Sequence, residues 1–149
     1  MKKKLLLSTA LKLQADLERM IKETEESIIK YNETEISTNK LFDTLEKQEA
    51  QLINIKEAIQ NANKTKGSDG KTNNYWIYYR ANLKKRLDGF LNMFNVSDEK
   101  KAQLSTSDVN KMRKQLAGEV AKLTNKLTAF NSNKHIKVEV DEDLNLILE

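Results

Sequence analysis

The sequence predicts an all-α protein, an elongated antiparallel helical bundle or coiled coil of three to four long helices with a short C-terminal β-hairpin. Its 149 residues include no proline and only four glycines, and proline is the residue that interrupts a helix most strongly. Apolar residues recur at spacings of three and four along most of the chain, but they alternate with polar residues near its end. We therefore expect a helical bundle over residues 1–133 and a β-hairpin or partner-binding tail over residues 134–149.

The first helix is predicted over residues 6–31. Before it, three lysines and a run of leucines resemble the start of a signal peptide, but the apolar run of about seven residues is at the lower limit for one. We expect instead a basic arm whose leucines enter the helix. The apolar or small positions with helical spacing are Ala10, Leu13, Leu17, Met20, Thr24, Ile28 and Tyr31.

The second helix is predicted over residues 38–63, after a polar segment rich in capping and turn residues. Its heptad seam, typical of a coiled coil, consists of Leu41, Leu45, Gln48, Leu52, Ile55, Ile59 and Ala62. Two interpretations of Gln48 remain open, a solvated side chain at the edge of the seam or a polar residue that specifies register or oligomeric state. We take Leu45, Leu52 and Ile59 as candidate oligomer contacts.

Residues 63–74 form the clearest predicted loop, because Gly67 and Gly70 permit a positive φ and Ser68-Asp69-Gly70 is a turn signature. It is either a helix–helix connection or a flexible binding loop. The third helix is predicted over residues 74–94. Its apolar positions include Trp76, Tyr79, Leu83, Leu87, Phe90 and Phe94.

Residues 95–98 could cap a short helix that extends to about residue 104, and capping residues at 105–108 precede the last long helix, which ends near residues 131–133. This helix has the most regular seam in the chain. The seam consists of Val109, Met112, Leu116, Val120, Leu123, Leu127 and Phe130.

The C-terminal residues change to a period of two, which predicts strands. An acidic turn at residues 141–143 separates two alternating segments, residues 135–140 and 144–148, which suggests a hairpin. The hairpin could rest on the helices or pair between chains; otherwise the tail is disordered or helical. The candidate oligomer contacts in it are Ile136, Val138, Val140, Leu144 and Leu146.

The residue types argue against an enzyme. The chain has one histidine and no cysteine, whereas zinc and di-iron sites usually need several imidazoles or thiolates. It also has no phosphate-binding glycine loop or nucleophile elbow. We therefore expect no catalytic residues, cofactor, metal or small-molecule substrate, and we consider a membrane partner an unlikely one because no segment is long enough to span a bilayer.

The positive charge is local, because residues 64–86 carry seven Lys and Arg against one Asp. These cations could follow phosphates, and the tyrosines among them could stack on bases; alternatively, the cations form a solvated face and the aromatics belong to the core. The candidate nucleic-acid or partner contacts of this basic aromatic band are Lys64, Lys66, Lys71, Tyr75, Tyr78, Arg80, Lys84, Lys85 and Arg86.

Parts of the chain resemble the septicolysin-like family of small bacterial helical proteins. The similar segments are residues 11–28, 55–65 (IKEAIQNANKT), 69–72, 80–87 and 109–131. Ala81 stands where the family has an acidic residue, and the C-terminal alternation has no counterpart in it. The resemblance implies a helical bundle and no active residues.

The regular seams lead us to expect a cytoplasmic, non-catalytic assembly or adaptor protein that acts through protein–protein interaction, as a homo-oligomer. The small, Lys- and Asn-rich character also suits a phage or mobile-element accessory protein. The alternative is a nucleic-acid-binding accessory protein that uses the basic aromatic band.

Overall fold

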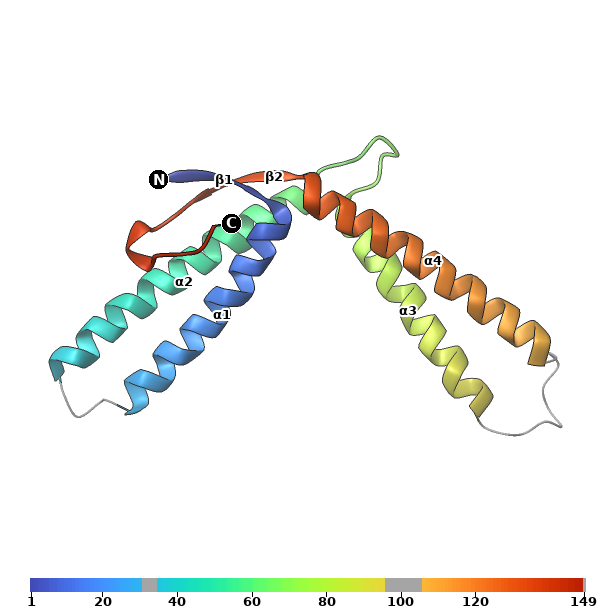
Figure 1. Cartoon of the computed structure of the whole chain (residues 1–149), viewed down its shortest axis with the longest axis horizontal. Helices are drawn as coiled ribbons and strands as arrows, with labels where there is room; N and C mark the ends of the chain where they lie inside the picture. Colours follow the sequence, from blue (N-terminus) through green and yellow to red (C-terminus); the bar gives the residue numbers. More distant parts are fainter. Residues whose placement is uncertain (31–34, 96–105, 149) are drawn as a thin grey trace. The chain divides into compact units, whose positions relative to one another are not determined.

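The protein is mostly helical, with four helices and a small two-stranded antiparallel sheet in the part of the chain that the structure describes (Figure 1). The structure is a computed structural model that describes residues 1–30, 35–95 and 106–148. In chain order the elements are β1 (Lys2–Leu6), α1 (Leu7–Lys30), α2 (Glu35–Asn63), α3 (Asn73–Asn95), α4 (Thr106–Asn133), β2 (His135–Glu139) and the 3₁₀ helix η1 (Glu142–Leu144).

The four long helices were predicted well. α1 begins one residue after its predicted start, α2 begins three residues before its own, and α3 and α4 differ from the prediction by one or two residues at the ends. The predicted position of Tyr31 and the short helix over residues 96–104 lie outside the described residues.

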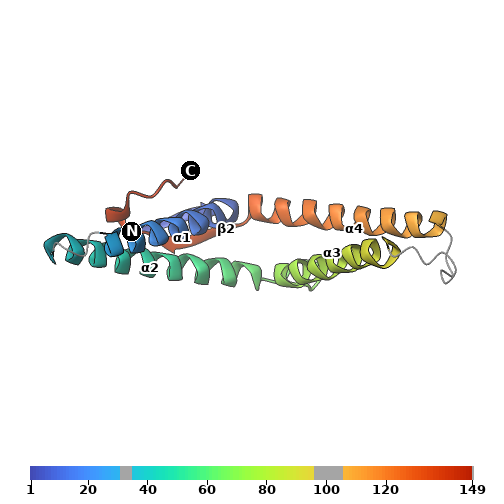
Figure 2. The same cartoon turned by 90° about the horizontal axis from the view of Figure 1, so that it is seen from below.

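The chain divides into two compact units. Unit 1 is Met1–Lys64 with Asn131–Glu149, and unit 2 is Thr65–Phe130. Unit 1 therefore contains the antiparallel helices α1 and α2 together with the sheet, and unit 2 contains α3 and most of α4. The helices of each pair run in opposite directions (Figures 1 and 2).

The core of unit 1 is the seam between α1, α2 and the sheet. Leu7, Leu13, Leu17 and Ile55 are almost completely buried. The sheet covers this seam with Leu5, Ile136 and Val138, each 7% exposed or less. Burying apolar side chains of this size is worth about 1.5–3 kcal/mol each, so a two-stranded sheet that is marginal alone is stabilised by the helices beneath it.

The predicted C-terminal β-hairpin is wrong in its second strand. β2 forms where the first alternating segment was expected, but it pairs with β1, so that Lys3 is opposite Val138 and Leu5 is opposite Ile136. Residues 142–144 form η1 and residues 145–148 form no strand. Leu144 lies 9% exposed in unit 1, so the second alternating segment places its first leucine in the core without strand pairing.

The N-terminal leucines are part of the fold. Leu5 lies in β1 and Leu7 begins α1, and both are buried. The Leu7 N–H donates to the Lys134 carbonyl oxygen at 2.7 Å, and the Val140 N–H donates to the Met1 carbonyl oxygen at 3.0 Å. These bonds extend the ladder beyond both ends of the named strands.

Gln48 is buried rather than solvated at the edge of the seam. It is 4% exposed, and its Oε1 lies 2.8 Å from Thr24 Oγ1, which is also 2.9 Å from the Met20 carbonyl oxygen. A hydroxyl has one proton and can donate to only one of these oxygens at a time. The polar position of the α2 seam therefore faces a polar position of α1 within the same chain.

Candidate functional site

The loop that begins unit 2 is a small, well-defined hairpin. Lys66 and Thr72 form a β-bridge. The Gly67 carbonyl oxygen accepts from the Gly70 N–H at 3.0 Å, and the Gly67 N–H donates to the Lys71 carbonyl oxygen at 2.8 Å. Gly70 has φ +74°, a conformation that glycine adopts without strain. This is a type I turn followed by a left-handed residue, a common way of closing a short hairpin.

The hairpin leads directly into α3 through a cap. The Thr72 hydroxyl accepts from the Tyr75 N–H at 3.1 Å, which satisfies one of the free donors of the first turn. Capping at Thr72 starts the helix at Asn73 and places Tyr75 and Trp76 in the first turn, beside the hairpin that precedes them.

Three aromatic residues of α3 form a cluster. Tyr75 and Tyr79 are stacked, with ring centroids 6.0 Å apart, and Trp76 meets both rings edge to face at 5.0 and 5.9 Å. Lys71 Nζ lies 4.5 Å from the centroid of the Tyr75 ring. Both tyrosines remain about 40% exposed and Trp76 is half-buried, so the cluster lies at the surface of unit 2.

Lys126 of α4 anchors this cluster, and no motif in the sequence marks it. Its Nζ lies 3.8 Å from the centroid of the Trp76 ring and 3.2 Å from Asp69 Oδ2. The other carboxylate oxygen of Asp69 accepts from the Lys71 N–H at 2.9 Å. The hydrogen bond from the Lys71 backbone, followed by that from Lys126, holds the pKa of Asp69 below its ordinary value.

A pocket of about 260 Å³ lies between the hairpin, α3 and α4, all within unit 2. Trp76 and Phe130 supply its apolar surface, and Asp69, Lys71 and Lys126 supply charges of both signs. Asp69 and Lys126 form an ion pair with each other. The negative charge of the pocket and one of its two positive charges are therefore neutralised within the chain.

The predicted band residues have different surroundings. Arg80 is half-buried, and its guanidinium donates to Thr124 Oγ1 at 3.4 Å, so it is directed at α4. Tyr78 is 69% exposed, the most exposed of the described aromatic side chains. Lys64, Lys66, Lys71, Lys84, Lys85 and Arg86 are all exposed, with Lys64 in unit 1 and the others in unit 2.

Most candidate oligomer contacts are buried within unit 1. The buried members are Ile59, Ile136, Val138, Val140 and Leu144. Leu45, Leu52 and Leu146 are half-buried. Side chains that are already packed in this way are poorly placed to contact a second copy. The large apolar side chains that are exposed lie elsewhere and include Ile29, Phe42, Ile53 and Ile147.

The described ranges, 1–30, 35–95 and 106–148, contain no group of three or more His, Cys, Asp and Glu residues that could hold a metal ion. Within the same ranges no helix combines the length and the apolar character required to cross a bilayer.

Comparison with known proteins found no matching family model, no matching curated protein and no matching solved structure.

Proposed function

We propose that this chain is a non-catalytic, cytoplasmic assembly or adaptor protein that acts through protein–protein contacts as a homo-oligomer. The observation that carries the proposal is the incomplete burial of the α4 seam. Leu123 and Leu127 are 9% and 4% exposed, whereas Met112, on the same stripe, is 39% exposed.

The remaining members of the stripe support the same conclusion. Val109, Leu116 and Val120 are half-buried. A pair of helices buries one stripe of each helix and leaves the flanks of that stripe in solvent. Association of two pairs into an antiparallel bundle would cover those flanks, which is the usual arrangement of coiled-coil and four-helix assemblies.

The test is the light-scattering mass of the full chain at low and at high salt, with Met112→Glu as the variant. We expect a mass of two or more chains that persists at high salt, because burial of apolar surface is not screened. Met112→Glu places a charge on the open stripe and should weaken association by about tenfold or more. Met112 is partly exposed, so helicity should be retained.

Asn125→Glu is the matched control, since it introduces the same charge at an exposed position on the opposite face of α4. It should leave the mass unchanged. A single-chain mass for the wild type at every concentration and salt would contradict the proposal, as would equal effects of the two substitutions.

A second candidate function is the binding of single-stranded nucleic acid by the basic aromatic band. The observation in its favour is the exposed Tyr78 ring, with Lys85 seven residues later on the same helical face. Stacking of a base on such a ring is worth about 1–3 kcal/mol, and the neighbouring cations would contact phosphates.

Replacing Lys84, Lys85 and Arg86 with Glu should abolish salt-sensitive binding of a labelled single-stranded oligonucleotide while the circular dichroism of the helices is unchanged. The matched control changes three exposed lysines of α4, Lys111, Lys114 and Lys122, to Glu. If wild-type protein shows no salt-sensitive binding, or if the control loses as much affinity, the band is not a nucleic-acid site.

A further inference from the structure

The two-stranded sheet of unit 1 has one apolar face and one basic face. Side chains alternate between the faces of a strand. Leu5, Ile136 and Val138 are buried against the helices, and the half-buried Lys3, opposite Val138, shares their face. The outward positions of β1 and β2 are Lys2, Lys4, Leu6, His135, Lys137 and Glu139, of which all but the half-buried Leu6 are exposed.

The register of the two strands places the lysines of this outer face close to one another. Lys4 is directly opposite Lys137 in the register, and Lys2 is two residues from Lys4 on the same strand. Opposite positions are about 5 Å apart, and outward positions along a strand repeat at about 6.8 Å. The described residues include no ion pair for Lys4 or Lys137. Lys2 makes no ion pair either, but its charge adds to the hydrogen bond from the Met1 amino group in lowering the pKa of Glu139.

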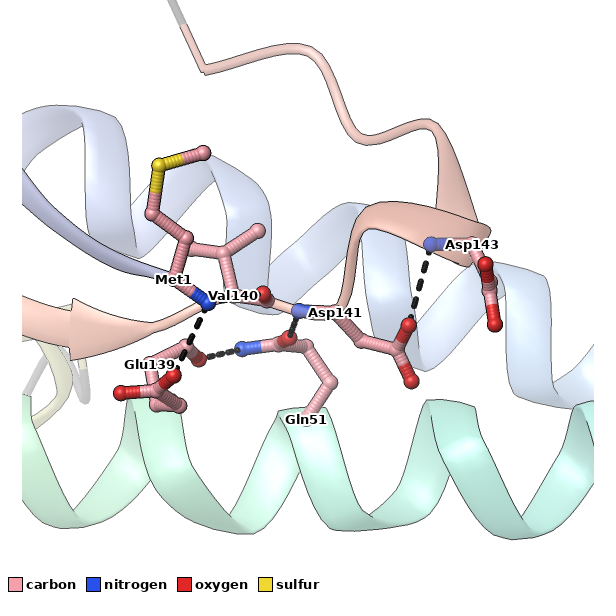
Figure 3. Close-up of polar contacts among 6 residues, drawn as sticks. All are labelled: Met1, Gln51, Glu139, Val140, Asp141 and Asp143. Carbon is pink, nitrogen blue, oxygen red and sulfur yellow. Dashed lines mark hydrogen bonds and ion pairs between the residues drawn. The ribbon is translucent and has the colours of Figure 1, made fainter.

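The acidic groups of the sheet are gathered at one end. Glu139 is opposite Lys2, and its Oε1 lies 2.9 Å from the Met1 amino nitrogen (Figure 3). Beyond it Asp143 pairs with Lys47 of α2 at 2.9 Å. The other end, with Lys4, Lys137 and His135, has no acidic residue on either strand.

Like charges directly opposite each other destabilise a pair of strands, and a two-stranded sheet has little stability to spare. The arrangement is favourable when an anion lies across the face and interacts with several lysines at once. The outward positions include no aromatic side chain for base stacking. Their one large apolar side chain is the half-buried Leu6, whereas an amphipathic surface that enters a bilayer presents a whole apolar face. These features favour a partner that offers regularly spaced phosphates and no exposed bases.

We infer that the outer face of the β1–β2 sheet, through Lys2, Lys4 and Lys137, binds the phosphate backbone of double-stranded nucleic acid without sequence preference. The inference is independent of the proposed assembly and of the basic aromatic band, because it concerns residues of unit 1 only.

The test is fluorescence anisotropy of a labelled DNA duplex with the full chain between 50 and 200 mM salt. The variant carries Lys2→Gln, Lys4→Gln and Lys137→Gln. Each lost phosphate contact should reduce the slope of log affinity against log salt by about 0.9, so we expect the slope to fall by about 2.7 and the affinity at the lower salt to fall at least about tenfold.

The matched control carries Lys12→Gln, Lys22→Gln and Lys40→Gln, three exposed lysines of α1 and α2, and it should bind the duplex within about twofold of wild type. The variant with Glu at positions 84–86 should also bind the duplex like wild type, which separates this site from the band.

Three results would overturn the inference: wild-type protein that does not bind the duplex, a control that loses as much affinity as the sheet variant, or loss of duplex binding in the 84–86 variant alone. Binding to vesicles of phosphatidylcholine and phosphatidylserine through the same lysines, without binding to the duplex, would assign the face to a membrane and also overturn it.

Discussion

Gln51 shows how one side chain joins a helix to a sheet. Its amide nitrogen donates to the Glu139 carbonyl oxygen at 2.8 Å, and its amide oxygen accepts from the Asp141 N–H at 2.7 Å (Figure 3). Gln51 is 2% exposed. A primary amide offers a donor and an acceptor together, so it pairs with the strand in the way that a neighbouring peptide group would.

Replacing Gln51 with Ala should destabilise unit 1 by about 2 kcal/mol, because it leaves two partly buried backbone groups without partners. The measurement is urea unfolding followed by circular dichroism. Gln60→Ala, at an exposed position of the same helix, is the control and should change stability by less than about 0.5 kcal/mol. Similar losses in both variants would show that the two bonds do not contribute.

The pair Thr24 and Gln48 could be predicted only in part. Both positions lie on the predicted apolar stripes of their helices, and each is polar. The heptad pattern shows that a residue faces a seam, but it does not show which residue of another helix it meets. The structure resolves this by placing the two side chains against each other in the core of unit 1, where hydrogen bonding offsets the cost of burying them.

Among the elements, the hairpin of residues 66–72 owes its geometry to particular residue types. Gly70 supplies the positive φ, Thr72 caps α3, and Asp69 binds both the Lys71 N–H and the Lys126 ammonium. The turn could be predicted because glycine and aspartate at these spacings are specific to it. The contact with Lys126 could not, because it joins residues 57 positions apart.

Asp69→Asn should lower the melting temperature of unit 2 at pH 7. The hydrogen bonds from the Lys71 backbone and from Lys126 lower the pKa of Asp69 from its ordinary value of 3.8. The ionised carboxylate therefore contributes its full stabilisation of the native state at pH values above this ordinary pKa. This stabilisation is lost as the pH falls through the lowered pKa. Asparagine retains an acceptor for the Lys71 N–H, so the substitution removes mainly the charge.

The fluorescence of Trp76, the only tryptophan and a neighbour of Lys126, reports the transition of unit 2. The difference between wild type and Asp69→Asn should shrink as the pH is lowered below 3.8. Asp88→Asn, at an exposed position of α3, is the control. A difference that is constant from pH 7 to strongly acidic solution would argue that the charge of Asp69 does not act in this way.

The sheet illustrates a second limit of sequence patterns. The alternation over residues 135–140 predicted β2 correctly. Its partner was misassigned because residues 144–148 alternate as well and are close in sequence, whereas β1 is short and its leading lysines conceal the alternation. Local pattern identifies a strand, but pairing depends on which segment the helices bring beside it.

For the molecule as a whole, the helices were predictable and their grouping was not. The absence of proline and the spacing of the leucines located four long helices to within three residues. The division into two units follows from long-range contacts, since residues 131–149 return to the N-terminal helices and residues 65–130 do not. A periodic stripe contains no information about such a return.

The bonds made by Gln51 also determine how the sheet could grow. Because the Val140 N–H is directed at Met1, the adjacent groups of Glu139 and Asp141 point to the opposite side of β2, and Gln51 occupies them. In the described part of the chain no third strand lies beside either β1 or β2, and Gln51 occupies the outer edge of β2 at Glu139 and Asp141. A strand from another molecule that added along β2 would therefore have to displace the Gln51 amide at this end of the edge. Without that amide the end of the β2 edge would be open to strand addition.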